Sequence, residues 1–285
     1  MTTTALIGLG HWGQNVAREL DLASEFKGYS DDLNKNLNAP YSYLTTEQIM
    51  HDTSIQALWI ATPVESHLNL ALAALAAGKH VMVEKPLAKP SEDMSEFISL
   101  SIASKKIVGV GYIYLYDNAF QKLCSEMAAH PPHIILAKWK KYGSFRDAIE
   151  LNLLSHHIAM SMAMCGKPCS IAYTEPMQYV SNDKLSVSIH FESCQFLSQV
   201  DRLSSEREHT MQITCHDGTQ YMWEVGKLSV RDKDGAWTNL YSADSNILRS
   251  EVKSFITSIE NKAPLRYDAR FGAKVTELLR LLPSH

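Results

Sequence analysis

The sequence Gly8-Leu9-Gly10-His11-Trp12-Gly13 lies almost at the N-terminus and directly follows a short apolar run, Thr3-Thr4-Ala5-Leu6-Ile7. After it, Val16, Ala17 and Leu20 recur at helical spacing. The order of strand, glycine-rich turn and helix is typical of the G-x-G-x-x-G turn of a dinucleotide site. The stretch therefore predicts a Rossmann-type beginning to the chain.

Each glycine of this motif has its own expected role. Gly8 allows the tight turn, Gly10 lets a pyrophosphate approach the backbone, and Gly13 lets the helix pack closely on the strand. Unpaired N–H groups at the start of the helix then face the phosphate. A glycine-rich turn without a ligand is the alternative interpretation.

An acidic residue follows the next predicted strand. Phe26–Ser30 is expected to be a strand, and Asp31 ends it about 20 residues after the motif, where an acid bonds the ribose 2′-hydroxyl. Because a carboxylate there repels a 2′-phosphate, the sequence favours NAD over NADP. Asp32 stands beside Asp31, so which of the two makes the contact stays open, and a solvated acidic pair is the alternative.

A second motif follows the apolar run His80–Val83. Glu84-Lys85-Pro86 places a lysine where a parallel strand ends, and ligands bind at that edge of an open α/β sheet. We expect Lys85 to face a bound nicotinamide and to transfer a proton. An exposed loop lysine is the alternative.

Composition bounds the class of protein. The chain has 285 residues, 45% hydrophobic residues and a net charge of −4, which gives no sign of nucleic-acid binding. No apolar run approaches the ~20 residues that span a bilayer, and Met1–Ala5 does not resemble a secretory signal. The five cysteines form no C-x-x-C pair. We therefore expect reduced thiols, a cytoplasmic location, no membrane partner and no metal site.

The pattern of elements changes part-way along the chain. Residues 1–116 alternate strand and helix, which predicts a parallel, doubly wound Rossmann domain that binds NAD. Residues 117–285 contain period-two strands such as Leu185–Phe191 and turn signals such as Asp217-Gly218. These predict an α+β domain on a mostly antiparallel open sheet, and the family resemblance described below implies that this domain serves substrate binding and dimerisation. A ligand cleft is expected between the two domains.

Taken together, the motifs resemble the glucose-fructose oxidoreductase/inositol dehydrogenase/MocA family over nearly the whole chain. The segments that carry the resemblance are Gly8–Gly13, Ala61-Thr62-Pro63 with His67, Gly78–Val81, Glu84-Lys85-Pro86 and Val110-Gly111-Tyr112. Residues Gly143–Gly166 are most similar to a branch found in sugar-nucleotide gene clusters. They include Arg146-Asp147 and Leu151–Ile158.

The resemblance implies an oxidoreductase that transfers a hydride between NAD(P) and a ring carbon of a sugar, sugar nucleotide or cyclitol. Oxidation of a secondary alcohol also requires a group that accepts the hydroxyl proton. Lys85 is the first candidate and His156 the second. Asn152 lies four residues before His156 on an expected helix, so the two side chains share a face and Asn152 can orient the substrate.

The family also implies two sets of binding residues and a homodimer or homotetramer. The expected cofactor-binding residues are Gly8, Gly10, His11, Trp12, Gly13, Asp31, Thr62, Pro63, His67, Glu84 and Lys85. The expected substrate-binding residues are Tyr112, Tyr114, Arg146 and His157. Two roles stay open: Glu84 either bonds the ribose or steadies the turn, and His157 is either structural or a binding contact.

The chain departs from the family pattern where relatives carry an aspartate. Asn152 can orient a hydroxyl but cannot accept a proton. This loss supports a second hypothesis, a protein of the same fold that senses NAD or a ligand without turnover.

Two further groups of residues have open roles. Tyr112, Tyr114 and Tyr116 alternate as on one face of a strand, so they either line the cleft or pack in the core. Lys138, Lys140 and Lys141 with Arg146 either meet a substrate diphosphate or form a solvated strand face.

Overall fold

The computed structural model describes residues 1–31, 39–143, 147–174, 183–244 and 246–282. The chain forms two compact units, Met1–Gly111 with Leu248–Thr276, and Tyr112–Ile247 with Glu277–His285. The first unit thus includes a late segment that the sequence assigned to the second domain. The roles proposed for the two domains stay predictions.

The first unit is built on a parallel sheet. Its strands are β1 (Thr3–Ile7), β2 (Glu25–Ser30), β3 (Ala57–Ile60), β4 (His80–Glu84) and β5 (Val108–Gly111). They lie in the order β2-β1-β3-β4-β5, and every pair is parallel. This confirms the predicted doubly wound, Rossmann-like domain. All residues of β1, β3 and β5 are buried, as expected for strands covered on both faces.

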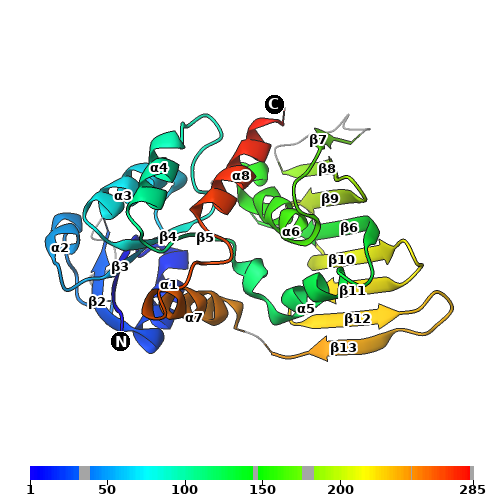
Figure 1. Ribbon diagram of the computed structural model, residues 1–285, viewed down its shortest axis with the longest axis horizontal. Coiled ribbons are helices and arrows are strands. Elements are labelled where there is room, and N and C mark those ends of the chain that lie inside the picture. Colours follow the sequence, from blue (N-terminus) through cyan, green and yellow to red (C-terminus); the bar gives the residue numbers. More distant parts are fainter. Residues whose placement is uncertain (32–38, 144–146, 175–182, 245, 283–285) are drawn as a thin grey trace. The chain divides into compact units, whose positions relative to one another are not determined.

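Helices connect these strands. They are α1 (His11–Ala23), α2 (Thr46–His51), α3 (Val64–Ala76) and α4 (Ser95–Ala103). Figure 1 shows α1 on one side of the sheet and α3 with α4 on the other. Thr45 and Gln48 form a capping box at the start of α2. Helix α4 begins at Ser95, whose N–H donates to the Asp93 carboxylate.

Two helices from the end of the chain also belong to this unit. They are α7 (Ile247–Glu260) and α8 (Ala269–Arg280), which extends just beyond the unit's end. The ring of Phe255 meets Trp59 edge to face at 6.0 Å, and Arg249 pairs with the buried Glu19 of α1 at 2.9 Å. Burial of apolar surface and one ion pair therefore hold α7 beside α1. Among the described helices, none is both long and apolar enough to cross a membrane.

The second unit is built on an eight-stranded sheet. Its strands are β6 (Pro132–Lys140), β7 (Ser170–Tyr173), β8 (Lys184–His190), β9 (Gln195–Asp201), β10 (Glu208–Cys215), β11 (Gln220–Glu224), β12 (Lys227–Arg231) and β13 (Thr238–Ser242). The order is β13-β12-β11-β10-β6-β9-β8-β7, with β6 and β9 parallel and the other pairs antiparallel. The mostly antiparallel sheet predicted from sequence is confirmed.

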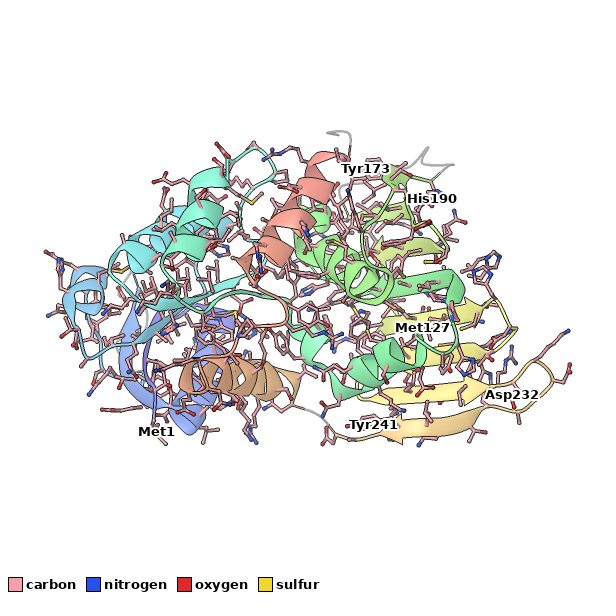
Figure 2. The ribbon with its side chains drawn as sticks, in the orientation of Figure 1. Met1, Met127, Tyr173, His190, Asp232 and Tyr241 are labelled. Atoms are coloured by element: carbon pink, nitrogen blue, oxygen red, sulfur yellow. The ribbon has the colours of Figure 1, made fainter. Side chains whose placement is uncertain are left out.

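Helices α5 (Asn118–Glu126) and α6 (Ser155–Cys165) lie along one face of this sheet (Figure 1). Figure 2 labels a residue on each edge strand of the sheet, Tyr173 on β7 and Tyr241 on β13. Successive residues of β6 alternate between the two faces. Ile135, Ala137 and Trp139 are buried, so they lie on the face opposite to Lys138 and Lys140.

The predicted strand face of three tyrosines is wrong. The strand β5 ends at Gly111, and Ile113–Tyr116 is a 3₁₀ helix, labelled η1. Because a 3₁₀ helix has about three residues per turn, residues two apart do not share a face. Tyr112 and Tyr116 are buried, whereas Tyr114 is only half-buried.

Asp117 joins the helical layer of the second unit to its sheet. Its carboxylate caps α5 at Ala119 and Phe120 and accepts hydrogen bonds from Trp223 Nε1 at 2.8 Å and the Gly226 N–H at 3.2 Å. The side chain is fully buried. A buried carboxylate of this kind is stable only while these donors surround it.

We expect Asp117→Ala to lower the free energy of unfolding by about 2–5 kcal/mol, because it removes a helix cap and leaves buried donors unpaired. Asp117→Asn keeps an acceptor oxygen and should cost less. Denaturant unfolding measures both, with exposed Asp234→Ala as a control expected within about 0.5 kcal/mol of the parent. Equal stability of Asp117→Ala and the parent would contradict this role.

Candidate functional site

The carboxyl ends of the parallel strands gather the residues of the first unit that were singled out from sequence. Gly8 follows β1, Asp31 follows β2, Thr62 follows β3 and Lys85 follows β4. The strand order reverses at β1, whose neighbours are β2 and β3. In open α/β sheets, ligands bind outside the carboxyl ends of the strands at such a reversal.

The three glycines of the turn have different surroundings. Gly8 has a φ of +97°, and a Cβ there would lie 2.5 Å from the Ala61 oxygen. A Cβ on Gly13 would collide with the Gly8 carbonyl oxygen, whereas one on Gly10 would meet no atom within 4 Å. Gly8 and Gly13 are therefore required by packing. Gly10 is exposed and leaves space beside the backbone, which fits the close approach of a pyrophosphate.

Helix α1 starts directly at this turn. Gly10 is its N-cap residue and makes no side-chain capping bond. His11 and Trp12 form its exposed first turn. The start of the helix is thus a cradle of backbone N–H groups that favours an anion.

Asp31 lies beside the turn. Its Oδ2 accepts a hydrogen bond from the Leu9 N–H at 2.9 Å. This bond fixes the acid next to the glycine turn, as a ribose contact requires. Asp32 lies outside the described residues, so the choice between the two acids stays a prediction.

The loop after β3 is connected to the loop after β4 by His67. The ring is buried, with Nε2 lying 2.8 Å from the Thr62 carbonyl oxygen and Nδ1 2.8 Å from the Pro86 carbonyl oxygen. His67 therefore braces both loops. Pro63 is exposed at the start of α3, and its contact with a cofactor stays a prediction, as does that of His67.

Lys85 is half-buried at the end of β4 and precedes Pro86 through a cis peptide bond. The neighbouring Glu84 points into the protein, where its Oε1 accepts a bond from Trp59 Nε1 at 3.1 Å. Trp12 of the glycine turn also donates to this carboxylate. Of the two roles left open for Glu84, these contacts favour steadying the turn.

Glu84 has a second buried carboxyl as a neighbour. Glu251 of α7 is fully buried, and neither carboxyl oxygen has a hydrogen-bond partner within the described residues. Burial raises the pKa of Glu251 well above its ordinary value, and the charge of Glu84 raises it further. Burial also raises the pKa of Glu84, although the bonds from Trp12 and Trp59 oppose this. We conclude that Glu84 carries the charge and Glu251 holds a proton.

In the second unit, Asn152 lies in a π-helical turn, Glu150–Leu154, that leads directly into α6. Such turns occur often at functional sites. His156 is the second residue of α6 and is buried among rings, with its ring centroid 5.1 Å from that of Tyr114 and 6.0 Å from that of Tyr112. Arg146 lies outside the described residues, so its expected contact stays a prediction.

His157 is fully buried, and its Nδ1 lies 2.7 Å from Ser198 Oγ. Burial lowers its pKa to about 3, so the imidazole is neutral. Of the two roles left open for His157, this position favours the structural one. Its contact with a substrate stays a prediction.

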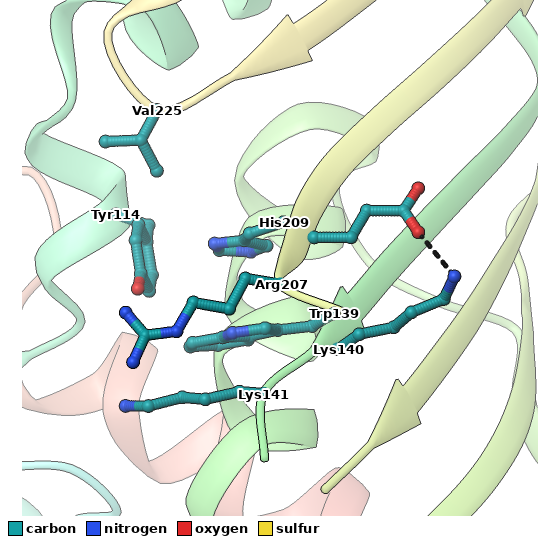
Figure 3. Close-up of a pocket in the computed structure, with 8 residues that line it drawn as sticks. Tyr114, Trp139, Lys140, Lys141, Arg207, His209 and Val225 are labelled. Carbon is teal, nitrogen blue, oxygen red and sulfur yellow. Dashed lines mark ion pairs between the residues drawn. The ribbon is translucent and has the colours of Figure 1, made fainter. Parts of the chain in front are cut away.

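A pocket of about 310 Å³ opens in the second unit. It is lined by Tyr114, Trp139, Lys140, Lys141, Arg207, Glu208, His209 and Val225 (Figure 3). Tyr114 was expected from sequence, and Lys140 and Lys141 belong to the lysine run. Trp139, Arg207 and His209 were not identified as site residues from the sequence. Trp139 and His209 become neighbours only through the pairing of β6 with β10. Among the described residues, no group of three or more His, Cys, Asp or Glu side chains could hold a metal.

Comparison with a family model identifies a relative of the first unit. Residues 3–112 match the GFO_IDH_MocA model, described as an oxidoreductase family with an NAD-binding Rossmann fold. This part of the chain is thus similar to the NAD-binding part of that family. The match covers the whole parallel sheet with its glycine turn, Asp31 and Lys85.

Individual relatives of the family match parts of the chain. An inositol 2-dehydrogenase of Pseudomonas savastanoi pv. phaseolicola is 31% identical over 39% of this chain and 28% of its own length. A UDP-N-acetylglucosamine 3-dehydrogenase of Acidithiobacillus ferrooxidans is 23% identical over 57% of this chain and 54% of its own. The matches thus span about half or less of these curated relatives.

The fold extends across both units. The solved structure of the Acidithiobacillus ferrooxidans enzyme GnnA aligns with a TM-score of 0.87 and 18% identity, covering 97% of this chain and 94% of that one. This similarity shows that the chain has the Gfo/Idh/MocA fold throughout.

The surroundings of the glycines give a first prediction. We expect Gly13→Ala to destabilise the protein by about 1–3 kcal/mol, because its Cβ collides with the Gly8 carbonyl. Gly10→Ala should leave the Tm unchanged within error but weaken NAD binding. Thermal unfolding and NADH fluorescence titration separate the two effects. Unweakened binding by Gly10→Ala would remove Gly10 from the cofactor site.

The protonated Glu251 gives a second prediction. As pH rises above the ordinary carboxyl pKa, the unfolded chain releases this proton and the folded chain retains it, so stability falls by up to about 1.4 kcal/mol per pH unit. Glu251→Gln removes this loss. The stability advantage of Glu251→Gln over the parent should therefore grow as pH rises above about 5, for as long as Glu251 keeps its proton in the folded protein.

Denaturant midpoints at several pH values test this expectation. Exposed Glu96→Gln on α4 is the matched control, and its difference from the parent should not change with pH in this way. A constant difference for Glu251→Gln would show that Glu251 is ionised in the folded protein.

Proposed function

We propose that this protein is an NAD-dependent oxidoreductase that transfers a hydride to or from a ring carbon of a sugar, sugar nucleotide or cyclitol. The observation that carries the proposal is the row of strand ends in the first unit. A phosphate-cradling turn, an acid and a lysine follow β1, β2 and β4 at one edge of a parallel sheet. A site that binds a dinucleotide beside a proton-transfer group requires these three features at one edge of the sheet.

The residues of the turn fit a nicotinamide dinucleotide. The pyrophosphate would bind in the space beside Gly10, at the uncapped start of α1. The Asp31 carboxylate would accept a hydrogen bond from a ribose hydroxyl. Because a 2′-phosphate would be repelled by Asp31, we propose NAD rather than NADP. When bound, NAD supplies the hydride acceptor or donor.

Lys85 is our proposed acid and base. Its amine would accept the hydroxyl proton as the alcohol becomes a carbonyl, and return it in the reverse direction. The bonds that Trp12 and Trp59 donate to Glu84 hold the residue before Lys85 in place. The backbone of Lys85 is therefore held in place at the end of β4.

Residues of the second unit would complete the reaction. We propose that His156 exchanges a proton with the substrate or holds its hydroxyl, and that Asn152 orients the substrate. The π-helical turn supports this role for Asn152, because it departs from the regular helix at that residue. An amide cannot accept the proton, so Lys85 and His156 share that task.

The names of the relatives suggest the substrates to test first. One matched relative is an inositol 2-dehydrogenase and another a UDP-N-acetylglucosamine 3-dehydrogenase. Both names describe oxidation of a ring hydroxyl. The same class of reaction is proposed for this chain.

We expect Lys85→Ala to reduce kcat by about 10²-fold or more while the Kd for NADH stays within error of the parent, because the amine transfers a proton and does not hold the dinucleotide. The assay follows NADH absorbance with myo-inositol, UDP-N-acetylglucosamine and a panel of sugars, and with keto-sugars in reverse. Lys89→Gln is the matched control, since this nearby lysine pairs with Glu65 at 3.1 Å.

Unchanged turnover by Lys85→Ala would refute the proposed acid and base. Tight NADH binding by the parent with no turnover of the whole panel would favour the alternative, an NAD- or ligand-sensing protein without catalysis.

A further inference from the structure

Cationic side chains line the pocket of the second unit. Lys141 and Arg207 line it, and Figure 3 shows both head groups extending in one direction, past the Trp139 ring. Lys140 extends the opposite way. Its Nζ lies 3.0 Å from both Glu206 and Glu208. The two carboxylates closest to Arg207 in sequence are therefore occupied by another cation.

Arg207 has no such carboxylate. Within the parts of the chain that the structure describes, no ion pair reaches its guanidinium, and the side chain is exposed. A guanidinium presents a planar fork of donors that matches phosphate or carboxylate oxygens. An exposed cation that lines a pocket while the neighbouring acids pair with another cation is suited to an anionic ligand.

The uncharged aromatic side chains of the pocket pack around the His209 ring. His209 stacks on Trp139 with ring centroids 4.0 Å apart, and the Tyr114 ring meets the His209 ring edge to face at 4.5 Å. Burial chiefly, and the electrostatic interactions with His157 and Lys141 to a smaller extent, lower the pKa of His209 well below its ordinary value, so the imidazole is neutral. Burial likewise raises the pKa of the Tyr114 hydroxyl, which therefore stays protonated.

Both ring nitrogens of His209 are buried and make no hydrogen bond among the described residues. A buried polar group without a partner costs about 1–3 kcal/mol. Such a group is expected where a ligand supplies the missing partner. This is a second observation, independent of the charges, that points to a polar ligand here.

We propose that this pocket binds a phosphate-bearing ligand, with Arg207 and Lys141 on the phosphate oxygens and Tyr114 and His209 on the ligand's hydroxyl groups. Calling this ligand the substrate rests on the proposed function, and the substrate is then a phosphorylated or nucleotide-linked sugar rather than a free sugar or cyclitol. Two adjacent cations suit a group with two negative charges better than a single carboxylate. The pocket volume is near the lower limit of about 300–1,000 Å³ typical of small-molecule sites, which suits one sugar unit with its phosphate.

Calorimetric titration of the intact protein tests this without turnover. The probes are UDP, glucose 1-phosphate, inorganic pyrophosphate, glucuronate and myo-inositol. Each titration is repeated with saturating NAD, which prevents a nucleotide probe from binding at the glycine turn. We expect UDP or glucose 1-phosphate to bind, and Arg207→Gln to weaken that binding about tenfold or more.

The variants separate charge from fold. Arg207→Lys should restore part of the affinity, because it keeps the charge and loses the fork. Lys141→Gln should weaken binding as well. Lys138→Gln removes a charge from the opposite face of β6 and should leave the Kd unchanged. Stronger binding of UDP than of glucose 1-phosphate would identify a nucleotide-linked sugar, and the reverse a simple sugar phosphate.

Failure of this proposal differs from failure of the proposed function. Three results would each overturn the phosphate site. The phosphate probes could bind Arg207→Gln as well as they bind the parent. Glucuronate or myo-inositol could bind better than any phosphate probe, or no phosphate probe could bind at all. In none of these cases is NAD-dependent turnover of a neutral sugar affected. Arg207-dependent binding of UDP without hydride transfer would instead keep the site and remove the proposed reaction.

Discussion

The close approach of α1 to the end of β1 is the constraint on which the first unit depends. The helix can begin at His11 only because Gly13 has no side chain to meet the Gly8 carbonyl. Once α1 is seated there, the Leu9 N–H reaches Asp31 and the Trp12 indole reaches Glu84. One backbone contact thus fixes the ends of three strands relative to one another. The chemistry proposed for this edge needs such a fixed frame.

Burial controls the protonation of side chains in both units. It raises the pKa of buried carboxyl groups and lowers the pKa of buried histidines. Glu251 keeps its proton because no donor stabilises its anion, whereas Glu84 is stabilised by two indole N–H groups. In the second unit, His157 and His209 lose their protons for the same reason, since burial penalises the cation. Burial therefore leaves Glu251, His157 and His209 uncharged, while the hydrogen bonds to Glu84 keep its charge.

Sequence predicts the first unit well because its site depends on backbone geometry. The glycine spacing, the acid after β2 and the lysine after β4 are local signals, and the parallel sheet brings them to one edge. The second unit is harder to predict, because its pocket depends on pairing between distant strands. Trp139 and His209 are 70 positions apart in sequence and become neighbours only through the register of β6 and β10.

The ends of two elements could not be predicted from sequence periodicity, and one prediction fails for that reason. The alternation of Tyr112, Tyr114 and Tyr116 has the period of a strand, but the sheet ends at Gly111 and the chain turns into a 3₁₀ helix. Tyr112 is consequently buried, and Tyr114 alone of the three lines the pocket. Likewise, the lysine run is a single pattern in sequence, yet β6 places Lys138 and Lys140 on one face and Lys141 lies beyond its end. Period alone cannot reveal where an element stops.

The two kinds of site have different consequences for specificity. Residues of the glycine turn are constrained by the packing of backbone on backbone, so a change there disturbs the frame as well as the ligand. Arg207 and Lys141 are exposed, so the fold tolerates their replacement. A scaffold of this type can keep one cofactor while its substrate changes through a few side chains at the end of the second sheet. If the proposed phosphate site binds the substrate, the charge of that pocket, rather than the fold, decides which sugar derivatives bind.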